Sequence, residues 1–214
     1  MLILFDCDGV LVDSEMIANR VMAAHLSAHG YPITGAQARQ RFIGRTIAKV
    51  MEMVRDAGVD LPDDFEATLR QKDEVAFARE LEPVRGVVNA LKRLDGRPKA
   101  VASSGSMAKI ERNLEITGLR NYFGPYLFSA AMVANPKPAP DLFLFAAREM
   151  NVAPADCWVI EDTPLGVEAA QRAGMRAAGF CGASHATPDL GDTLRRAGAE
   201  VVFDDMARMP GILR

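Results

Sequence analysis

Near the start of the chain, an uncharged apolar run at residues 2–5 is followed at once by Asp6 and Asp8. Such a run is typical of a central strand in a parallel sheet, which is covered on both faces. Residues two apart on a strand share a face, so we expect both carboxylates on one side of the strand end. Two like charges at the edge of an apolar interior repel each other unless a cation or a proton lies between them. The stretch therefore predicts a buried parallel strand and a site that holds positive charge.

Two different patterns follow this first strand. Residues 15–81 show only helical spacing of apolar residues, which indicates a bundle of about four helices. From residue 82 onward, strand and helix patterns alternate, which favours right-handed βαβ units and a parallel sheet. The later strands are expected at residues 99–103, 126–130, 157–161, 176–180 and 200–203. We predict an α/β fold with two domains, residues 1–14 with 82–214 and the helical insertion 15–81.

Composition and charge exclude some classes of protein. Hydrophobic residues make up 49% of the 214-residue chain, enough for a sizeable buried core. The net charge of −3, without a basic cluster, gives no electrostatic case for nucleic-acid binding. The apolar start is too short for a signal peptide or a membrane span, so we expect a cytoplasmic protein that does not bind membranes. The sequence does not set the oligomeric state, and a monomer is compatible with it.

Two other motifs have ordinary explanations. Cys7 stands between two aspartates, which disfavour its thiolate, so we expect it to pack in the core rather than act as a nucleophile. His25 and His29 are four residues apart in an expected helix, a spacing that zinc pairs use. The glutamate of an HExxH motif is absent between them, so we do not expect a zinc site there.

The carboxyl ends of the expected strands carry polar residues, and in open parallel sheets ligands bind outside these ends. Each residue alone has a simpler explanation, since serines satisfy turns, acids favour helix starts and a lone lysine is usually a solvated surface charge. Together they supply hard oxygen ligands for Mg²⁺ and a cation and N–H donors for phosphate. These residues are Asp6, Asp8, Ser103, Ser104, Glu161 and Asp162, with Lys137 in the proline-rich segment NPKPAPD.

Four motifs in order make the chain resemble the haloacid dehalogenase superfamily of phosphohydrolases. They are FDCDGVLVDSE, VASS, KPAPD and VIEDTPLGVEAA. The chain is most similar to the branch that includes β-phosphoglucomutase, phosphoglycolate phosphatase and sugar-phosphate phosphatases. The resemblance implies a Rossmann-like parallel sheet core and makes residues 15–81 a small inserted α-helical cap domain.

The resemblance also implies catalytic roles. Asp6 would be the nucleophile that forms an aspartyl-phosphate, and Asp8 the general acid and then the general base. Mg²⁺ would bind the Asp6 carboxylate, the Asp8 backbone carbonyl and the Asp162 carboxylate. Glu161 would support the metal shell, directly or through water.

Further residues are expected to contact the substrate. By the same resemblance, Ser103, Gly9 and the Ser104 amide would hold the phosphoryl group, and Lys137 would neutralise its charge. In the helical insertion, Arg20, Arg45 and Lys49 are candidates to meet a second anionic group of the substrate. For each of these three, a solvated surface position is the alternative.

The function that we expect from this resemblance is Mg²⁺-dependent hydrolysis of a small phosphorylated metabolite, a sugar phosphate or a sugar-acid phosphate such as 6-phosphogluconate. The main alternative is a phosphomutase of the β-phosphoglucomutase type. Ala18 stands where that pattern has a cap histidine, and Arg45, Thr46 and Ile47 follow Gly44 without the pattern's arginine three residues on.

Two other classes are less consistent with the sequence. A haloacid dehalogenase needs neither magnesium nor an acid two residues after its nucleophile, so Asp8 and Asp162 count against it. A non-catalytic binding protein of this fold would be expected to lack one of the four residues Asp6, Asp8, Lys137 and Asp162, and all four are present.

Overall fold

The computed structural model describes residues 1–42 and 45–213, so Gly44 lies outside the described residues. The chain divides into two compact units. One contains Met1–Asp13 and Glu82–Arg214, and the other contains Ser14–Leu81. The helical unit thus begins at Ser14, one residue before the boundary expected from the sequence.

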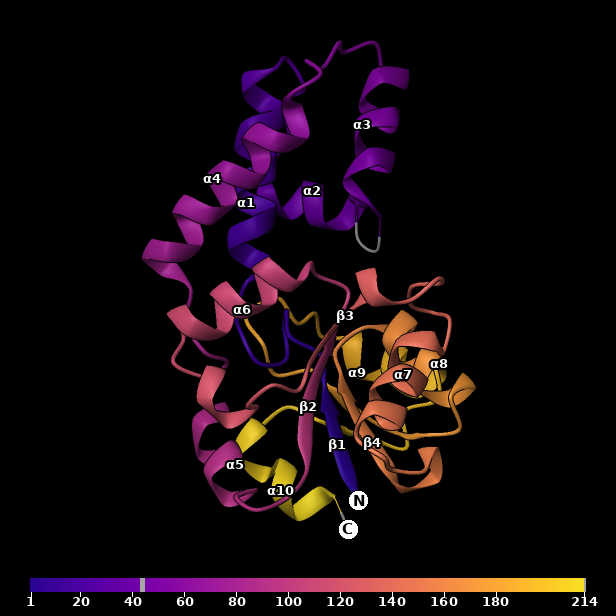
Figure 1. Cartoon of the computed structure of the whole chain (residues 1–214). Coiled ribbons are helices and arrows are strands. Elements are labelled where there is room, and N and C mark those ends of the chain that lie inside the picture. Colours follow the sequence, from indigo (N-terminus) through magenta and orange to yellow (C-terminus); the bar gives the residue numbers. More distant parts are fainter. Residues whose placement is uncertain (43–44, 214) are drawn as a thin grey trace. The chain divides into compact units, whose positions relative to one another are not determined.

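A six-stranded parallel sheet forms the centre of the first unit, with the order β3-β2-β1-β4-β5-β6. Figure 1 labels β1 to β4 of this sheet. The strands are β1 Leu2–Phe5, β2 Lys99–Ser103, β3 Leu127–Ser129, β4 Cys157–Glu161, β5 Arg176–Phe180 and β6 Val201–Phe203. Strands β3 and β6 are shorter than predicted. The first strand is central, because β2 and β4 pair with it on either side. The predicted α/β fold with a parallel sheet and an inserted helical region is confirmed.

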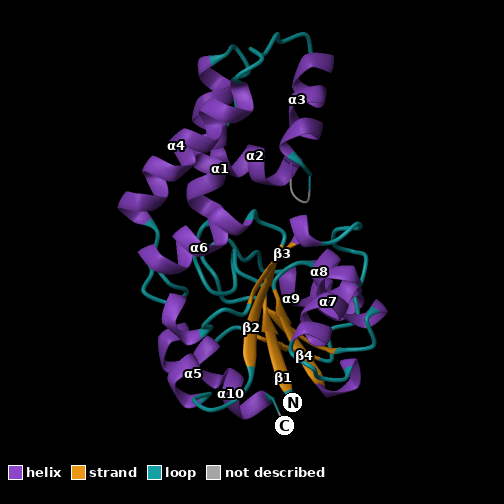
Figure 2. Cartoon of the chain, in the orientation of Figure 1, coloured by secondary structure: helices purple, strands orange, loops and turns teal. Residues whose placement is uncertain are grey.

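Helices cover both faces of this sheet (Figure 2). They are α5 Val87–Arg93, α6 Met107–Ile116, α7 Asp141–Glu149, α8 Pro164–Arg172, α9 Leu190–Arg196 and α10 Met209–Ile212. Short 3₁₀ turns lie at η1 Arg120–Tyr122, η2 Ala130–Met132, η3 Pro154–Asp156 and η4 Met206–Arg208. Figure 1 shows α7 and α8 on one side of the sheet and α5 and α10 on the other.

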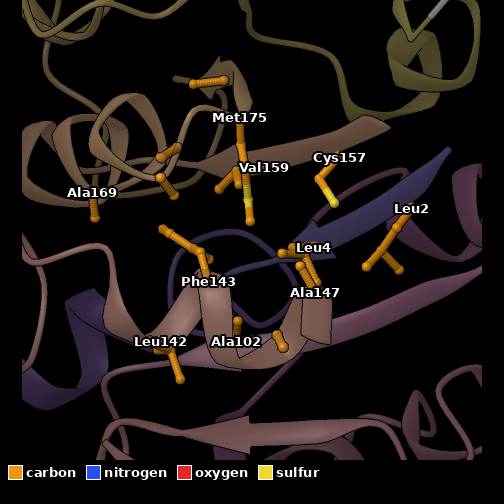
Figure 3. Packing of buried hydrophobic residues seen from close by; sticks show 14 of the residues in the cluster. Leu2, Leu4, Ala102, Leu142, Phe143, Ala147, Cys157, Val159, Ala169 and Met175 are labelled. Atoms are coloured by element: carbon orange, nitrogen blue, oxygen red, sulfur yellow. The ribbon is translucent and has the colours of Figure 1, made fainter. Parts of the chain in front are cut away.

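The core between the sheet and α7 fixes the strand ends in place. Leu4 of β1, Val159 of β4 and Phe143 of α7 belong to one buried cluster and are fully inaccessible to solvent (Figure 3). Burying a side chain of this size stabilises a fold by about 1.5–3 kcal/mol. A strand held by such contacts presents its last residues in a defined position.

The second unit consists of helices and has its own apolar core. Its helices among the described residues are α1 Glu15–Ala28, α2 Gly35–Phe42, α3 Ile47–Asp56 and α4 Phe65–Glu80. Thr46 caps α3 by accepting a hydrogen bond from the Lys49 amide, as N-cap threonines do. The core residues come from all four helices and include Leu26, Ala38, Val54, Phe65 and Leu69. Across the described part of the chain, no helix combines the length and apolar character that a membrane crossing requires.

A buried histidine ties α1 to α4 within this unit. His25 is 1% exposed and its ring stacks on Phe65, with ring centroids 4.3 Å apart. Lys72 Nζ lies 2.9 Å from His25 Nδ1, and an ammonium group only donates, so Nδ1 accepts. Nε2 therefore carries the hydrogen and donates to the Phe65 carbonyl at 3.2 Å. His25 is neutral in this arrangement.

We predict that His25 makes the helical unit less stable in mild acid. Burial lowers the pKa of His25, and the charges of Lys72 and His29 lower it further, while the Phe65 carbonyl and Asp64 oppose them. Below the pKa of an unfolded histidine, about 6.5, the unfolded chain takes up a proton that the native chain does not. The stabilisation is complete above that pH and is lost as the pH falls from there toward the lowered native pKa, by at most about 1.4 kcal/mol per pH unit.

The measurement is urea unfolding of the parent and of His25→Gln at about pH 7.5 and about pH 5.5. The other titrating groups are common to both proteins, so the difference between their pH dependences isolates His25. The parent should lose more stability on acidification than the variant. Equal losses would show that His25 does not carry this pH dependence.

Candidate active site

One lysine joins the ends of the two central strands. Lys137, in the loop between η2 and α7, places Nζ 2.7 Å from Asp6 Oδ1 and 2.7 Å from Glu161 Oε1. Nζ also donates to the Ala102 carbonyl at 3.0 Å. The lysine side chain is only 5% exposed and lies over the ring of Phe143, 4.9 Å from its centroid. All three ammonium hydrogens therefore have protein acceptors, so contact with a phosphoryl oxygen would require one of these bonds to be exchanged.

The charges around Lys137 do not balance. Burial alone would lower the pKa of Lys137, but the carboxylates of Asp6 and Glu161 raise it well above its ordinary value. Burial raises the pKa of Asp6, Glu161 and Asp162 raise it further, and Lys137 opposes them. Asp6 and Glu161 pair with Lys137, and the buried Asp162 beside them has His185 as a partner, so three acids lie close to one lysine in this part of the site. A divalent cation would balance this site.

Glu161 shapes the turn after β4. Its Oε2 accepts hydrogen bonds from the amides of Asp162 and Thr163, each at 3.1 Å, and from Thr163 Oγ1 at 2.8 Å. Thr163 Oγ1 in turn caps α8 by accepting from the Gly166 amide at 3.1 Å. A Cβ on Gly166 would lie 1.9 Å from Glu161 Oε1, so only glycine fits beside the carboxylate. Glu161 Oε1 thus accepts from Lys137 and Oε2 accepts from the turn, and support of the metal shell by Glu161 stays a prediction.

A tight turn follows the two aspartates at the end of β1. The strand ends at Phe5, and the Cys7 carbonyl accepts from the amides of Leu11 and Val12 at 2.9 and 3.0 Å. Asp8 thus lies beyond the end of β1, where it forms an isolated β-bridge with Val12 across the turn. Cys7 is buried as predicted, and burial raises the pKa of its thiol well above the ordinary value, with the neighbouring aspartates adding to the effect.

Gly9 makes room for Asp162. Its φ of +79° is a conformation that favours glycine, and a Cβ would lie 2.0 Å from Asp162 Oδ2. Its amide donates to the Val12 carbonyl at 2.8 Å. The Gly9 amide is therefore used within the turn after β1. Because Gly9 has no side chain, this turn can lie close to Asp162 in the turn after β4.

The predicted phosphate-binding serines follow β2. Ser103 is 1% exposed, and its Oγ accepts from the Gly105 amide at 3.1 Å, while Ser104 is exposed. Ser129, at the end of the adjacent β3, donates from Oγ to the Gly105 carbonyl at 2.6 Å. The loop after β2 is thus fixed from two strands, and Ser129 is a contributor that the sequence reasoning did not identify.

Sequence reasoning also missed a cation beside Asp8. Lys109, in the first turn of α6, places Nζ 2.8 Å from Asp8 Oδ2. A signal for it was present, because the helix dipole disfavours a cation near a helix N-terminus, so a lysine there suggests another partner.

A second missed residue is His185, in the loop after β5. Its Nε2 lies 3.0 Å from Asp162 Oδ2. Its position just beyond the carboxyl end of a strand was the available signal, by the same rule that identified the other strand-end residues.

The three cations proposed from the helical unit are spread over its surface. Arg20 pairs with Glu80 at 2.5 Å and Lys49 with Glu52 at 2.7 Å. Arg45 is exposed and donates from Nε to the Arg41 carbonyl at 3.3 Å. All three side chains are exposed, and each makes its own contact within the helical unit.

The donor set fits a hard divalent cation. The residues predicted to bind it supply two side-chain carboxylates, Asp6 and Asp162, and one backbone carbonyl, that of Asp8. Among the described residues, no group of three or more His, Cys, Asp or Glu side chains is arranged to hold a metal ion. A set with only two carboxylate side chains agrees with this, and the excess of acids over lysines around Asp6 favours a cation.

A parallel α/β sheet with buried acids, a lysine and serines at its central strand ends defines the class, a hydrolase of phosphoric monoesters. The family model for haloacid dehalogenase-like hydrolases matches residues 1–174. The chain belongs to this family.

Relatives and a solved structure agree with this assignment. The chain is 32% identical to the 6-phosphogluconate phosphatase of Escherichia coli over 189 residues, 87% of this chain and 85% of the relative. It is 33% identical to the fructose-1-phosphate phosphatase of the same organism over 180 residues, 82% and 93% of the two chains. A haloacid dehalogenase-like protein from Agrobacterium tumefaciens matches with a TM-score of 0.89 and 37% identity, covering 99% of this chain and 96% of the other.

Proposed function

We propose that the protein hydrolyses phosphate esters of small sugars or sugar acids in a Mg²⁺-dependent reaction through an aspartyl-phosphate on Asp6. The observation that carries the proposal is the buried group of Asp6, Lys137 and Glu161, next to Asp162, with an excess of negative charge. The activities named for the two Escherichia coli relatives, on 6-phosphogluconate and fructose 1-phosphate, support the substrate class.

The Asp6 and Asp162 carboxylates and the Asp8 carbonyl would hold the metal, which when bound supplies positive charge between the acids and the phosphate. A phosphate dianion would otherwise approach a site that already has excess negative charge. Lys137 holds Asp6 Oδ1, so the other oxygen of that carboxylate, Oδ2, is the one we assign to the attack on phosphorus.

The first half of the proposed reaction transfers the phosphoryl group to Asp6. The Asp6 oxygen forms a bond to phosphorus as the bond from phosphorus to the ester oxygen breaks, and protonated Asp8 gives its proton to that leaving oxygen. The Ser103 hydroxyl accepts from Gly105, so its own hydrogen can be donated to a phosphoryl oxygen. The Ser104 amide would bind a second phosphoryl oxygen.

The second half releases phosphate. Asp8, now a carboxylate, takes a proton from water as the water oxygen attacks phosphorus, and Asp6 leaves as a carboxylate. The Lys109 ammonium lies 2.8 Å from Asp8 Oδ2 and so holds this side chain in place. The aspartates thus return to their starting states without another reactant.

The test is phosphate release from 6-phosphogluconate, fructose 1-phosphate, glucose 6-phosphate and phosphoglycolate, with Mg²⁺ and with excess chelator. We expect release from at least one sugar or sugar-acid phosphate, loss of that release with chelator, and its return when Mg²⁺ is restored, since the proposed ligands are all oxygens. Full activity in chelator would contradict the metal requirement.

The product from β-glucose 1-phosphate separates hydrolysis from the mutase alternative. With a catalytic amount of the sugar bisphosphate, we expect any product to be inorganic phosphate, because Ala18 replaces the histidine of the mutase pattern. Stoichiometric glucose 6-phosphate would instead establish a mutase.

A further inference from the structure

The loop after β5 is fixed to the neighbouring strand. The Cys181 amide donates to the Phe203 carbonyl at 2.9 Å. A Cβ on Gly182 would lie 1.8 Å from the Asp204 carbonyl oxygen, so glycine is required for this close approach. The residues that follow are therefore held at the carboxyl end of the sheet.

Ser184 ties this loop to the segment that follows the nucleophile. Its Oγ donates to Asp13 Oδ1 at 2.7 Å, and its amide lies 3.3 and 3.4 Å from the two Asp13 oxygens. Asp13 in turn belongs to the segment containing Asp6 and Asp8, and its amide donates to the Glu82 carbonyl at 3.0 Å. The position of the loop is thus coupled to the position of the first motif.

His185 contacts the predicted metal ligand from the same loop. Its Nε2 lies 3.0 Å from Asp162 Oδ2, and the two side chains are only 9% and 2% exposed. Its Cε1 would lie 2.8 Å from a Cβ on Gly9, so the ring is packed against the turn after β1. A carboxylate only accepts, so Nε2 carries a hydrogen and donates it to Asp162.

We infer that His185 is a positioning residue for the metal site. By holding Oδ2, it sets the plane of the Asp162 carboxylate before a divalent cation arrives, as outer partners of metal ligands do. Through its hydrogen bonds to Asp13, Ser184 holds the loop that carries His185 against the segment that supplies Asp6 and Asp8. The inference rests on the proposed function, because it requires Asp162 to bind the cation.

The test compares His185→Leu with His185→Gln by direct metal binding. Glutamine can place an N–H near the position of histidine Nε2, whereas leucine has no donor. Thr187→Val, on an exposed residue of the same loop, is the matched control. Free Mn²⁺ is measured by electron paramagnetic resonance in titrations without substrate, and thermal unfolding is recorded for each protein.

We expect His185→Leu to weaken Mn²⁺ binding by about tenfold or more, the loss typical of outer-shell partners, and His185→Gln to recover most of it. Thr187→Val should bind like the parent. Mn²⁺ binding by His185→Leu equal to the parent's would overturn the inference while leaving the metal site intact. Equal losses in the leucine and glutamine variants, with matching losses of thermal stability, would also overturn it, since they indicate a packing role alone.

The failure of the proposed function has a different signature. A parent protein that binds no more Mn²⁺ than Asp162→Asn has no metal site at Asp162, and this would remove both proposals. The comparison between parent and Asp162→Asn therefore comes first, and the His185 variants are interpreted against it.

Discussion

Asp6→Asn is expected to leave the protein folded and to reduce turnover by about a thousandfold or more, because an amide does not form the acyl-phosphate. Its fold should tolerate the change, because Asp6 is one of three buried acids around a single lysine and its own pKa is raised. The measurements are phosphate release with the best substrate of the panel and thermal unfolding.

Asp156→Asn is the matched control for this change. Asp156 is exposed and immediately precedes β4, at the opposite end of the strand from Glu161. It should retain the parent's activity. Activity of Asp6→Asn within about tenfold of the parent would contradict the assignment of the nucleophile.

Lys137→Met is expected to destabilise the protein and to abolish activity. Removing one partner from a buried charge pair typically costs about 3–5 kcal/mol, because the remaining charge is left uncompensated. Here Asp6 and Glu161 both lose the ammonium group, while methionine retains much of the apolar contact with Phe143. Urea unfolding in chelator, which removes any metal contribution, measures the loss.

A second substitution tests the cause of this loss. In Lys137→Met with Glu161→Gln, one unpaired charge is gone, so part of the stability should return while activity stays absent. Lys92→Met, on an exposed residue of α5, is the control for loss of a lysine and should be close to the parent. A Lys137→Met protein as stable as the parent would show that the buried charges do not depend on this lysine.

The sheet and much of the candidate site could be predicted because both follow local rules. Buried parallel strands are short apolar runs, and ligand-binding residues follow their carboxyl ends. These rules, with the motif resemblance, identified the group formed by Asp6, Lys137 and Glu161, although its members are far apart in the sequence.

The remaining features depend on contacts between segments that are far apart in the sequence. Lys109 reaches Asp8 from a helix, and His185 reaches Asp162 from a loop, so each pairing exists only after β2 and β5 take their places in the sheet. The part played by Glu161 also depended on the fold, since its second oxygen is used by the turn into α8. Spacing in the sequence does not show which backbone amides such an acid will accept from.

The most direct test of the central claim is to trap the phosphoryl group on the protein. Asp8→Ala lacks the base for the second half of the reaction, so its aspartyl-phosphate should accumulate in a single turnover with an aryl phosphate, a substrate whose leaving group needs little protonation. After acid quench, mass spectrometry should show one added phosphoryl group, on the peptide that contains Asp6, and none in the Asp6→Asn protein. Phosphoryl transfer to another residue, or substrate cleavage by Asp8→Ala with no phosphoryl group on the protein at any time, would contradict the mechanism.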